Sequence, residues 1–236
     1  QVVRAFRPAR EMNRPTHDPA NAPWRALYPD DVAFVWGDPM DASAPLFPGE
    51  AAYIARAVEK RRREFMKGRE CARRALEAID EAPVAILQGA QREPIWPAGA
   101  VGSISHTLTL CGAVAGPRAT YQALGLDIEQ ALPIEPGIWP RILTDGERRR
   151  LEALPADRRG LEARVIFSIK ECFYKCQHER SKTFMGFQEA SVELDDTTFA
   201  CTFENDVPPF ARGTVLSGRW VRNEHVIVSA MWLKNG

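Results

Sequence analysis

The sequence predicts an α+β fold, in which helices pack on a small and mainly antiparallel sheet. Two stretches carry apolar residues at helical spacing, and short segments of strand character lie between and after them. The 236 residues are enough for a single domain or for two small halves that pack closely together.

The composition is that of an ordinary globular protein. Apolar residues make up 45% of the chain and charged residues 26%, which excludes the disordered and membrane-spanning classes. Lys and Arg balance Asp and Glu at 31 each, so the whole molecule has no long-range attraction for nucleic acid or anionic lipid. We therefore expect neither nucleic acid nor a membrane as a partner, and any anion site must be local.

Apolar segment lengths and cysteine usage point to the cytoplasm. No stretch approaches the roughly 20 apolar residues that span a bilayer, and the opening residues lack the apolar core of a signal peptide. The five cysteines are odd in number and lie in apolar contexts, which favours reduced and buried thiols. A metal site at Cys172, Cys176 and His178 would lack a fourth ligand at finger-like spacing.

The first half begins with an irregular, proline-rich lead-in over residues 1–48, with one strand expected at 32–37. A helix is expected over 50–79, because Val58 and Phe65 begin an apolar pattern that repeats every seven residues. Shorter segments complete this half. They are a strand at 84–89, a proline-bound loop at 92–99, and two short strands around a turn at 101–116.

The second half begins with a strand over residues 121–130. Leucine and isoleucine occupy one face of this strand, and Gly125, Asp127 and Glu129 occupy the other, so both carboxylates point the same way. Thr144 and Glu147 form a capping-box signature for a helix that runs through residue 154. A stronger helix is expected over 162–178. Strands are expected after it at 191–194, 198–203, 215–221 and 225–233.

Three acidic residues form the first candidate site: Asp127 and Glu129 on the strand, and Glu171 on the later helix. Oxygen-only carboxylate sets favour a hard cation, Mg²⁺ or Mn²⁺, completed by water and substrate phosphate. Each motif also has an ordinary explanation. An Asp-x-Glu pair can be the solvated face of a strand, and Glu171 with Lys175 four residues later can be an exposed helix pair.

Each basic candidate residue, taken alone, also has both a functional and an ordinary explanation. Arg69 follows Gly68, where the lack of a side chain would let a ligand approach the helix backbone, although most charges over 59–74 must face water. Arg92 lies in the proline-bound loop, where a guanidinium suits phosphate binding but can also be a surface residue. His106 could donate to an anion or simply occupy a turn. The chain has no G-x-S-x-G, G-x-x-x-x-G-K-[ST] or G-x-G-x-x-G motif.

Taken together and in order, these segments resemble the long-type 4'-phosphopantetheinyl transferases, in the subgroup typified by enterobactin synthetase component D. The strand motif GLDIE at 125–129 and the helix motif FSIKECFYK at 167–175 carry the resemblance. RRREFMKGRECARRAL (61–76), the loop REPIWP (92–97) and the strand Gly-Ser-Ile-Ser-His at 102–106 add to it.

The resemblance implies two pseudo-symmetric α+β halves, at residues 1–120 and 121–236, with coenzyme A bound in the cleft between them. It implies transfer of the 4'-phosphopantetheine group from coenzyme A to a serine of an apo acyl or peptidyl carrier protein, with Mg²⁺ or Mn²⁺ as cofactor. The implied catalytic residues are Glu171 and Lys175, and the implied metal ligands are Asp127, Glu129 and Glu171. The implied coenzyme A ligands are Arg61, Arg69, Arg92, Ser105, His106, Asp127 and Lys175.

Other functions stay open at this point. A noncatalytic module that binds coenzyme A or a carrier protein would keep the same fold, and a Mg²⁺-dependent phosphohydrolase could use the same carboxylates. The sequence does not decide whether the carrier serves fatty acid, polyketide, siderophore or other peptide synthesis. Because one chain supplies both halves, we expect a monomer.

Overall fold

The computed structural model describes residues 23–42 and 44–236, so residues 1–22 and 43 of the predicted lead-in at 1–48 lie outside the described residues. The α+β prediction is confirmed. The helices are α1 (Glu59–Glu77), α2 (Trp139–Ile142), α3 (Asp145–Glu152) and α4 (Ala156–Ser181). The strands are β1 (Ala33–Gly37), β2 (Ala100–His106), β3 (Cys111–Pro117), β4 (Tyr121–Gln130), β5 (Ala190–Leu194), β6 (Thr198–Phe203), β7 (Val215–Arg222) and β8 (Val226–Lys234).

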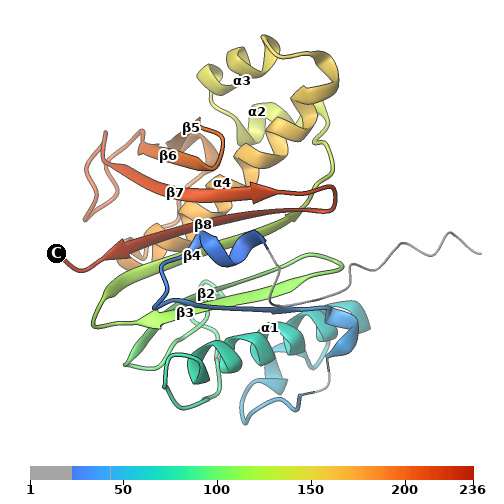
Figure 1. Cartoon of the computed structure of the whole chain (residues 1–236), viewed down its shortest axis with the longest axis vertical. Coiled ribbons are helices and arrows are strands. Elements are labelled where there is room, and N and C mark those ends of the chain that lie inside the picture. The colour runs from blue at the N-terminus through green and yellow to red at the C-terminus, as the bar shows by residue number, and fades with distance from the viewer. Residues whose placement is uncertain (1–22, 43) are drawn as a thin grey trace, which may run out of the picture.

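The strands form two antiparallel sheets. The first has the order β1-β3-β2 and packs against α1, and the second has the order β4-β8-β7-β6-β5 and packs against α4 (Figure 1). The capping box of Thr144 and Glu147 opens α3, as predicted. The strands predicted after the second long helix are all present as β5 to β8.

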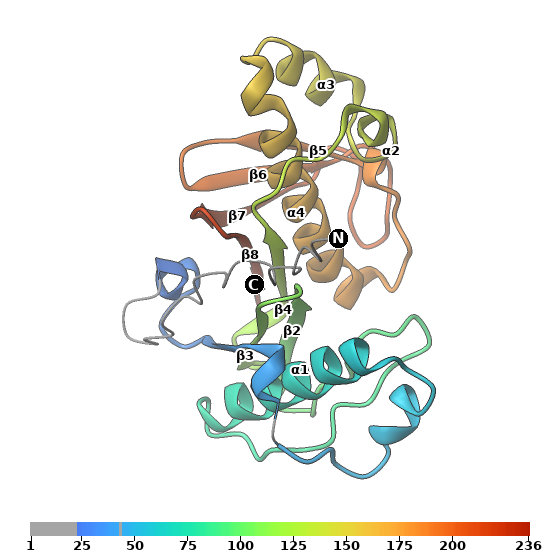
Figure 2. The ribbon, with the colours of Figure 1, turned by 90° about the vertical axis from the view of Figure 1, so that its right-hand side faces the viewer.

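The two sheets meet where β2 lies beside β4, between α1 and α4 (Figure 2). At this seam the backbone N–H of Leu126 donates to the Ser103 hydroxyl, and the N–H of Ile128 donates to the Ser105 hydroxyl, each at 3.1 Å. Serine side chains therefore accept the hydrogen bonds that a neighbouring strand's carbonyl groups accept inside a continuous sheet.

Both faces of β4 are covered. Its leucine and isoleucine side chains join a core with β8 and the first sheet, and its other face lies against α4. The approach of α4 is close, since a Cβ at Gly125 would stand 2.3 Å from the Cys172 carbonyl oxygen. The predicted alternation is present, but Asp127 is only 3% exposed, so the solvated-face explanation is wrong for this residue.

The first long helix begins later than predicted. Residues Ala51–Ile54 form a 3₁₀ turn, and α1 starts at Glu59, so Val58 is 71% exposed and outside the buried stripe. At the break Val58 is extended, and the Arg62 guanidinium binds the Ala55 and Ala57 carbonyls at 2.9 Å, in place of the backbone N–H groups of a continuous helix.

No strand forms at 84–89, contrary to the prediction. The backbone groups of Ile86 are bonded to side chains instead of to a neighbouring strand: its N–H donates to Glu50 Oε1 at 2.9 Å, and its carbonyl accepts Arg69 Nε at 2.8 Å. Because these buried groups are already satisfied, the segment stays an extended connection with a single bridge between Gln88 and Pro94.

The described part of the lead-in is more ordered than predicted and reaches the second half. Its strand β1 pairs with β3, while the Tyr28 hydroxyl donates to the Gly125 carbonyl, and Arg219 donates to the Ala26 carbonyl at 2.9 Å.

The boundary after residue 120 stays a prediction. All five cysteines are free and buried, as expected. Within residues 23–42 and 44–236, no helix is long and apolar enough to cross a membrane.

We predict that Gly125→Ala lowers the free energy of unfolding by about 1–3 kcal/mol, because the new methyl group must push α4 away from β4. Gly137→Ala is the matched control, since no atom lies within 4 Å of its added Cβ, and it should change stability by less than about 0.5 kcal/mol. Urea unfolding of both variants gives the comparison. Equal stability of the two would contradict the close packing of α4.

Candidate active site

An ion pair at the seam joins three elements. Lys175 of α4 donates through Nζ to Asp127 Oδ1 of β4 at 2.7 Å, to the Leu126 carbonyl at 3.0 Å, and to the Ser105 hydroxyl of β2 at 3.1 Å. The Ser105 hydroxyl in turn donates to Asp127 Oδ1 at 3.0 Å. The structure therefore brings together three predicted site residues from both halves of the chain.

One carboxylate oxygen of this cluster has no partner in the part of the chain that the structure describes. Asp127 Oδ2 is buried and accepts no hydrogen bond from any described residue. Burial alone would lower the pKa of Lys175, but the Asp127 and Glu171 carboxylates outweigh burial and raise this pKa. Lys175 is thus held as a cation beside the unpartnered Asp127 Oδ2. A bound metal ion, or a water molecule that also contacts a phosphate, could supply the missing partner of this oxygen.

Glu171 lies one helical turn before Lys175 and is half-buried. Burial raises the pKa of its carboxyl group; the Lys175 charge opposes this shift, and the Asp127 charge adds to it. A cavity of about 240 Å³ opens beside Glu171, between α4 and the segment that follows it. Its apolar lining comes from Phe173, Tyr174, Phe184, Met185 and Phe187.

Glu129 is less available than predicted. Its carboxylate accepts Arg164 Nη1 at 2.9 Å, and burial together with the Asp127 charge raises its pKa to about 7. Within the described parts of the chain, no three His, Cys, Asp or Glu side chains gather closely enough to hold a metal ion by themselves. The donor chemistry still fits Mg²⁺, which binds through one or two carboxylates and takes its remaining ligands from water and phosphate.

His106 and Arg61 form a second pair on the other side of the seam. Arg61 Nη1 donates to His106 Nε2 at 2.5 Å, and Glu64 Oε2 lies 3.5 Å from both Arg61 Nη1 and His106 Nδ1. Burial, with the Arg61 charge in addition, lowers the pKa of His106 to about 4. His106 is therefore neutral near pH 7, and with Nε2 as acceptor its N–H is at Nδ1.

Arg69 is buried rather than surface-exposed. Its Nε donates to the Ile86 carbonyl, its guanidinium lies 4.2 Å from the centre of the Phe65 ring, and its Nη2 is buried without a partner among the described residues. Gly68 does not admit a ligand as expected, since its Cα faces Ile104 of β2, 3.1 Å from an added Cβ. This glycine serves the packing of α1 on the first sheet.

Arg92 stands apart from the cluster. Its side chain is exposed, and its backbone adopts a φ of 68°, which few residues other than glycine favour. The loop that carries it is attached to α4, because His178 Nε2 and Gln91 Oε1 are 3.0 Å apart. The loop is thus held near the second half, but no hydrogen bond in the described chain links Arg92 itself to the other predicted residues.

Two partners of the site were not predicted: Glu64 beside His106, and Arg164 beside Glu129. Glu64 carried a usable signal, because it stands three residues after Arg61 and therefore on the same face of α1. Arg164 carried none, since its pairing depends on how far α4 extends toward the end of β4. Both residues hold a predicted ligand in place.

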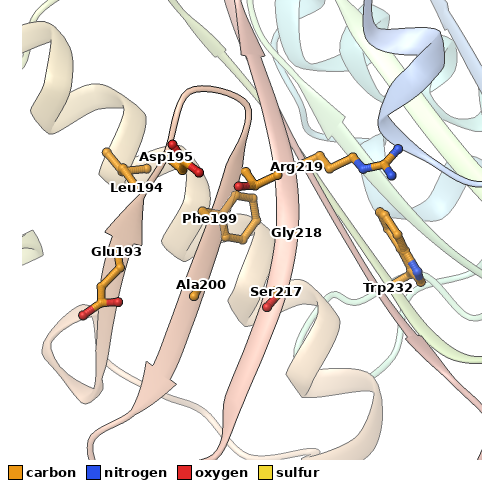
Figure 3. Close-up of a pocket in the computed structure, with 10 residues that line it drawn as sticks. Glu193, Leu194, Asp195, Phe199, Ala200, Ser217, Gly218, Arg219 and Trp232 are labelled. Carbon is orange, nitrogen blue, oxygen red and sulfur yellow. The ribbon is translucent and has the colours of Figure 1, made fainter.

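A larger hollow of about 590 Å³ lies elsewhere, on the outer face of the second sheet (Figure 3). Glu193 and Asp195 stand on one side of it and Arg219 with Trp232 on the other, and the Arg219 guanidinium is 5.5 Å from the Trp232 ring centre. None of the residues of the seam cluster lines this hollow. The chemistry-bearing groups lie at the seam instead.

Two models of known families match the chain. The family model for the 4'-phosphopantetheinyl transferase N-terminal domain matches residues 49–116, and the model for the 4'-phosphopantetheinyl transferase superfamily matches residues 123–227. The chain belongs to the 4'-phosphopantetheinyl transferase superfamily. The second match contains β4 and α4, which supply Asp127, Glu171 and Lys175.

Individual transferases of this superfamily are similar over most of the chain. The 4'-phosphopantetheinyl transferase PptT of Mycobacterium tuberculosis is 34% identical over 218 residues, covering 86% of this chain and 93% of the relative. The transferase Svp of Streptomyces mobaraensis is 35% identical over 198 residues, covering 82% and 80%. Enterobactin synthase component D of Salmonella typhimurium is 36% identical over 140 residues, covering 58% and 56%.

We predict that His106 lowers the free energy of unfolding of this transferase at acidic pH. The unfolded chain binds a proton near pH 6.5, whereas folded His106 resists it until about pH 4, so stability falls as the pH drops through this interval. His106→Gln should lose less stability than the wild type between pH 6.5 and 4.5, by roughly 1–2 kcal/mol after allowance for solvent screening. Urea unfolding at several pH values measures the difference.

The exposed His225, on the turn between β7 and β8, provides the control. His225→Gln should follow the wild-type dependence, since its side chain stays in solvent. If His106→Gln and His225→Gln lost stability equally on acidification, the lowered pKa of the partly exposed His106 would be refuted.

Proposed function

We propose that this chain transfers the 4'-phosphopantetheine group of coenzyme A to a serine hydroxyl of an apo acyl or peptidyl carrier protein. The oxygen of the serine forms a bond to the β-phosphorus, the phosphorus–oxygen bond to the α-phosphate breaks, and 3',5'-ADP leaves with the electron pair. The seam cluster carries this proposal, because Lys175 and the unpaired Asp127 Oδ2 meet there within reach of Glu171.

Phosphoryl transfer needs positioning and charge neutralisation more than covalent help from the protein. Lys175 meets the second need, since the neighbouring carboxylates keep it a cation. Arg61, Arg69, Arg92 and His106 are the proposed ligands of the other phosphates. Arg69 Nη2 is buried without a partner among the described residues, so it offers a hydrogen bond to an anion. Neutral His106 would turn its Nδ1–H from Glu64 toward the phosphate.

Ser105 is proposed to act indirectly and not as a direct ligand of coenzyme A. Its hydroxyl already accepts from Ile128 N–H and from Lys175, and it donates to Asp127. Ser105 is also only 5% exposed. We therefore assign it to orienting Lys175 and Asp127, while the neighbouring His106 faces the phosphates.

The proposed metal ligands are Asp127, Glu129 and Glu171, with Mg²⁺ as the expected ion and Mn²⁺ as a substitute. A bound Mg²⁺ would neutralise charge on the pyrophosphate as the leaving group departs. Asp127 is the best-supported ligand because its Oδ2 has no donor within residues 23–42 and 44–236. Glu129 would exchange its Arg164 partner for the ion, and its raised pKa shows that its environment disfavours an uncompensated charge.

Glu171 is proposed to accept the serine proton, directly or through one water. Burial raises its pKa, which makes it a stronger base than an exposed glutamate while it remains close to Lys175. The apolar cavity beside Glu171 is the nearest place for the uncharged pantetheine arm, which would leave the phosphates on the Lys175 side.

A noncatalytic module that binds coenzyme A is the alternative. Retention of Asp127, Glu171 and Lys175 in one cluster favours the enzyme. We predict that the protein, with Mg²⁺ and coenzyme A, increases the mass of an apo carrier protein by one phosphopantetheine group, and that excess chelator prevents this. Mass spectrometry of the carrier decides. An unchanged carrier with intact coenzyme A binding would support the alternative, and full transfer in chelator would end the metal assignment.

We predict that Glu171→Gln lowers the transfer rate by roughly 10²–10⁴, because the amide cannot accept the serine proton. Its affinity for coenzyme A at saturating Mg²⁺ should stay near the wild-type value if Glu171 acts chiefly as the base. Calorimetry and single-turnover assays measure the two quantities. Glu193→Gln, on β5 away from the cluster, is the control and should keep full activity. A loss of affinity as large as the loss of rate would make Glu171 chiefly a metal ligand.

A further inference from the structure

Lys170, the residue before Glu171, borders the same cavity, but its ammonium group is buried between α4 and neighbouring segments. Its side chain is 1% exposed, and Nζ donates to the Phe187 carbonyl at 2.7 Å, to Glu147 Oε2 at 2.7 Å and to the Ile142 carbonyl at 3.0 Å. A lysine ammonium has three N–H donors, and all three are used here. Lys170 therefore has no hydrogen left for a substrate.

The partner Glu147 is fully buried and is also saturated. Besides Lys170, its Oε2 accepts the Thr144 backbone N–H at 2.7 Å, and its Oε1 accepts the Val192 N–H at 2.8 Å. The ion pair thus links α4 to the end of α2, the start of α3 and strand β5. Its charges are paired and hydrogen-bonded, which a buried pair requires to be tolerated.

The bond to Phe187 leads back to the active site. Phe187, with Phe184 and Met185, lines the apolar cavity beside Glu171, and this segment forms the wall opposite α4. The Phe187 ring also packs on Phe167 of α4, with ring centres 5.3 Å apart. Lys170 adds a buried hydrogen bond that ties this wall to the helix turn that carries Glu171.

We propose that Lys170 is a positioning residue for phosphopantetheine transfer, holding segment 184–187 so that the cavity beside Glu171 keeps its shape. The proposal rests on the transfer function proposed above. Without the bond to Phe187, the wall of the cavity is no longer tied to the helix at this point. Substrate would then bind less well and in less productive positions next to Glu171.

Two single variants separate this role from general stability. Lys170→Met leaves Glu147 buried without its cation and removes the bond to Phe187, whereas Glu147→Gln weakens the same pair but keeps that bond. Both should lower the melting temperature by roughly 10 °C. Below both melting temperatures, Lys170→Met should lose at least tenfold in kcat/KM, chiefly through KM for coenzyme A. Glu147→Gln should stay within about threefold of the wild type.

A double variant provides the second test. Lys170→Met with Glu147→Leu removes both charges, and apolar replacement of a buried pair commonly restores stability. Its melting temperature should recover while its kcat/KM stays at least tenfold low. The control is Lys67→Met with Glu70→Leu, which removes another ion pair of 2.8 Å in α1 and should leave transfer unchanged.

Two results would overturn the proposal: activity that recovers together with stability in the double variant, or equal losses of activity in Lys170→Met and Glu147→Gln. Either would show that Lys170 contributes only to folding. A wild-type protein that fails to modify any apo carrier would refute the transfer function instead. This result needs no variant, so it is distinct from a failure of the Lys170 proposal.

Discussion

The ion pair between Lys175 and Asp127 is the contact on which the site depends. It joins α4 to β4, and the Ser105 hydroxyl extends it to β2, so one cluster links the two sheets. A buried charge pair of this kind is costly to desolvate and is tolerated only where its remaining hydrogen bonds are made. The cluster meets this condition except at Asp127 Oδ2, and that exception marks where a ligand can bind.

The surrounding fold can be understood from this requirement. Gly125 lets α4 approach β4 closely enough for Lys175 to reach Asp127, and the serines of β2 satisfy the outer backbone groups of β4. The charged groups proposed for phosphoryl transfer, Lys175 and Asp127, therefore lie on α4 and β4, two elements held in place by the hydrophobic core. Lys170, on the opposite side of α4, uses a second buried pair to hold the cavity wall beside Glu171. The two lysines of one helix motif thus serve separate sides of the same site.

Local patterns in the sequence predicted the positions of Asp127, Glu171 and Lys175 on their strand and helix better than they predicted what surrounds these residues. The alternation in β4 placed Asp127 correctly, and helical spacing placed Glu171 one turn from Lys175. Burial of Asp127 was not predictable, because alternation identifies a strand face but not what covers it. Ile86 shows a further limit. Its segment resembles a strand, yet Glu50 and Arg69, distant in sequence, bind its backbone. The partners of Lys170 lie 17 to 28 residues away, on elements that only the tertiary fold brings near.

A double-mutant cycle on the unfolding free energy tests the central ion pair most directly. Asp127→Asn, Lys175→Met and the combined variant are unfolded in urea beside the wild type, each free of ligand. If the pair joins the halves as the structure indicates, the sum of the two single losses of unfolding free energy should exceed the loss of the double variant by a coupling energy of about 1–3 kcal/mol. Additive losses, with a coupling energy near zero, would contradict a direct interaction between Asp127 and Lys175 and remove the basis of the site.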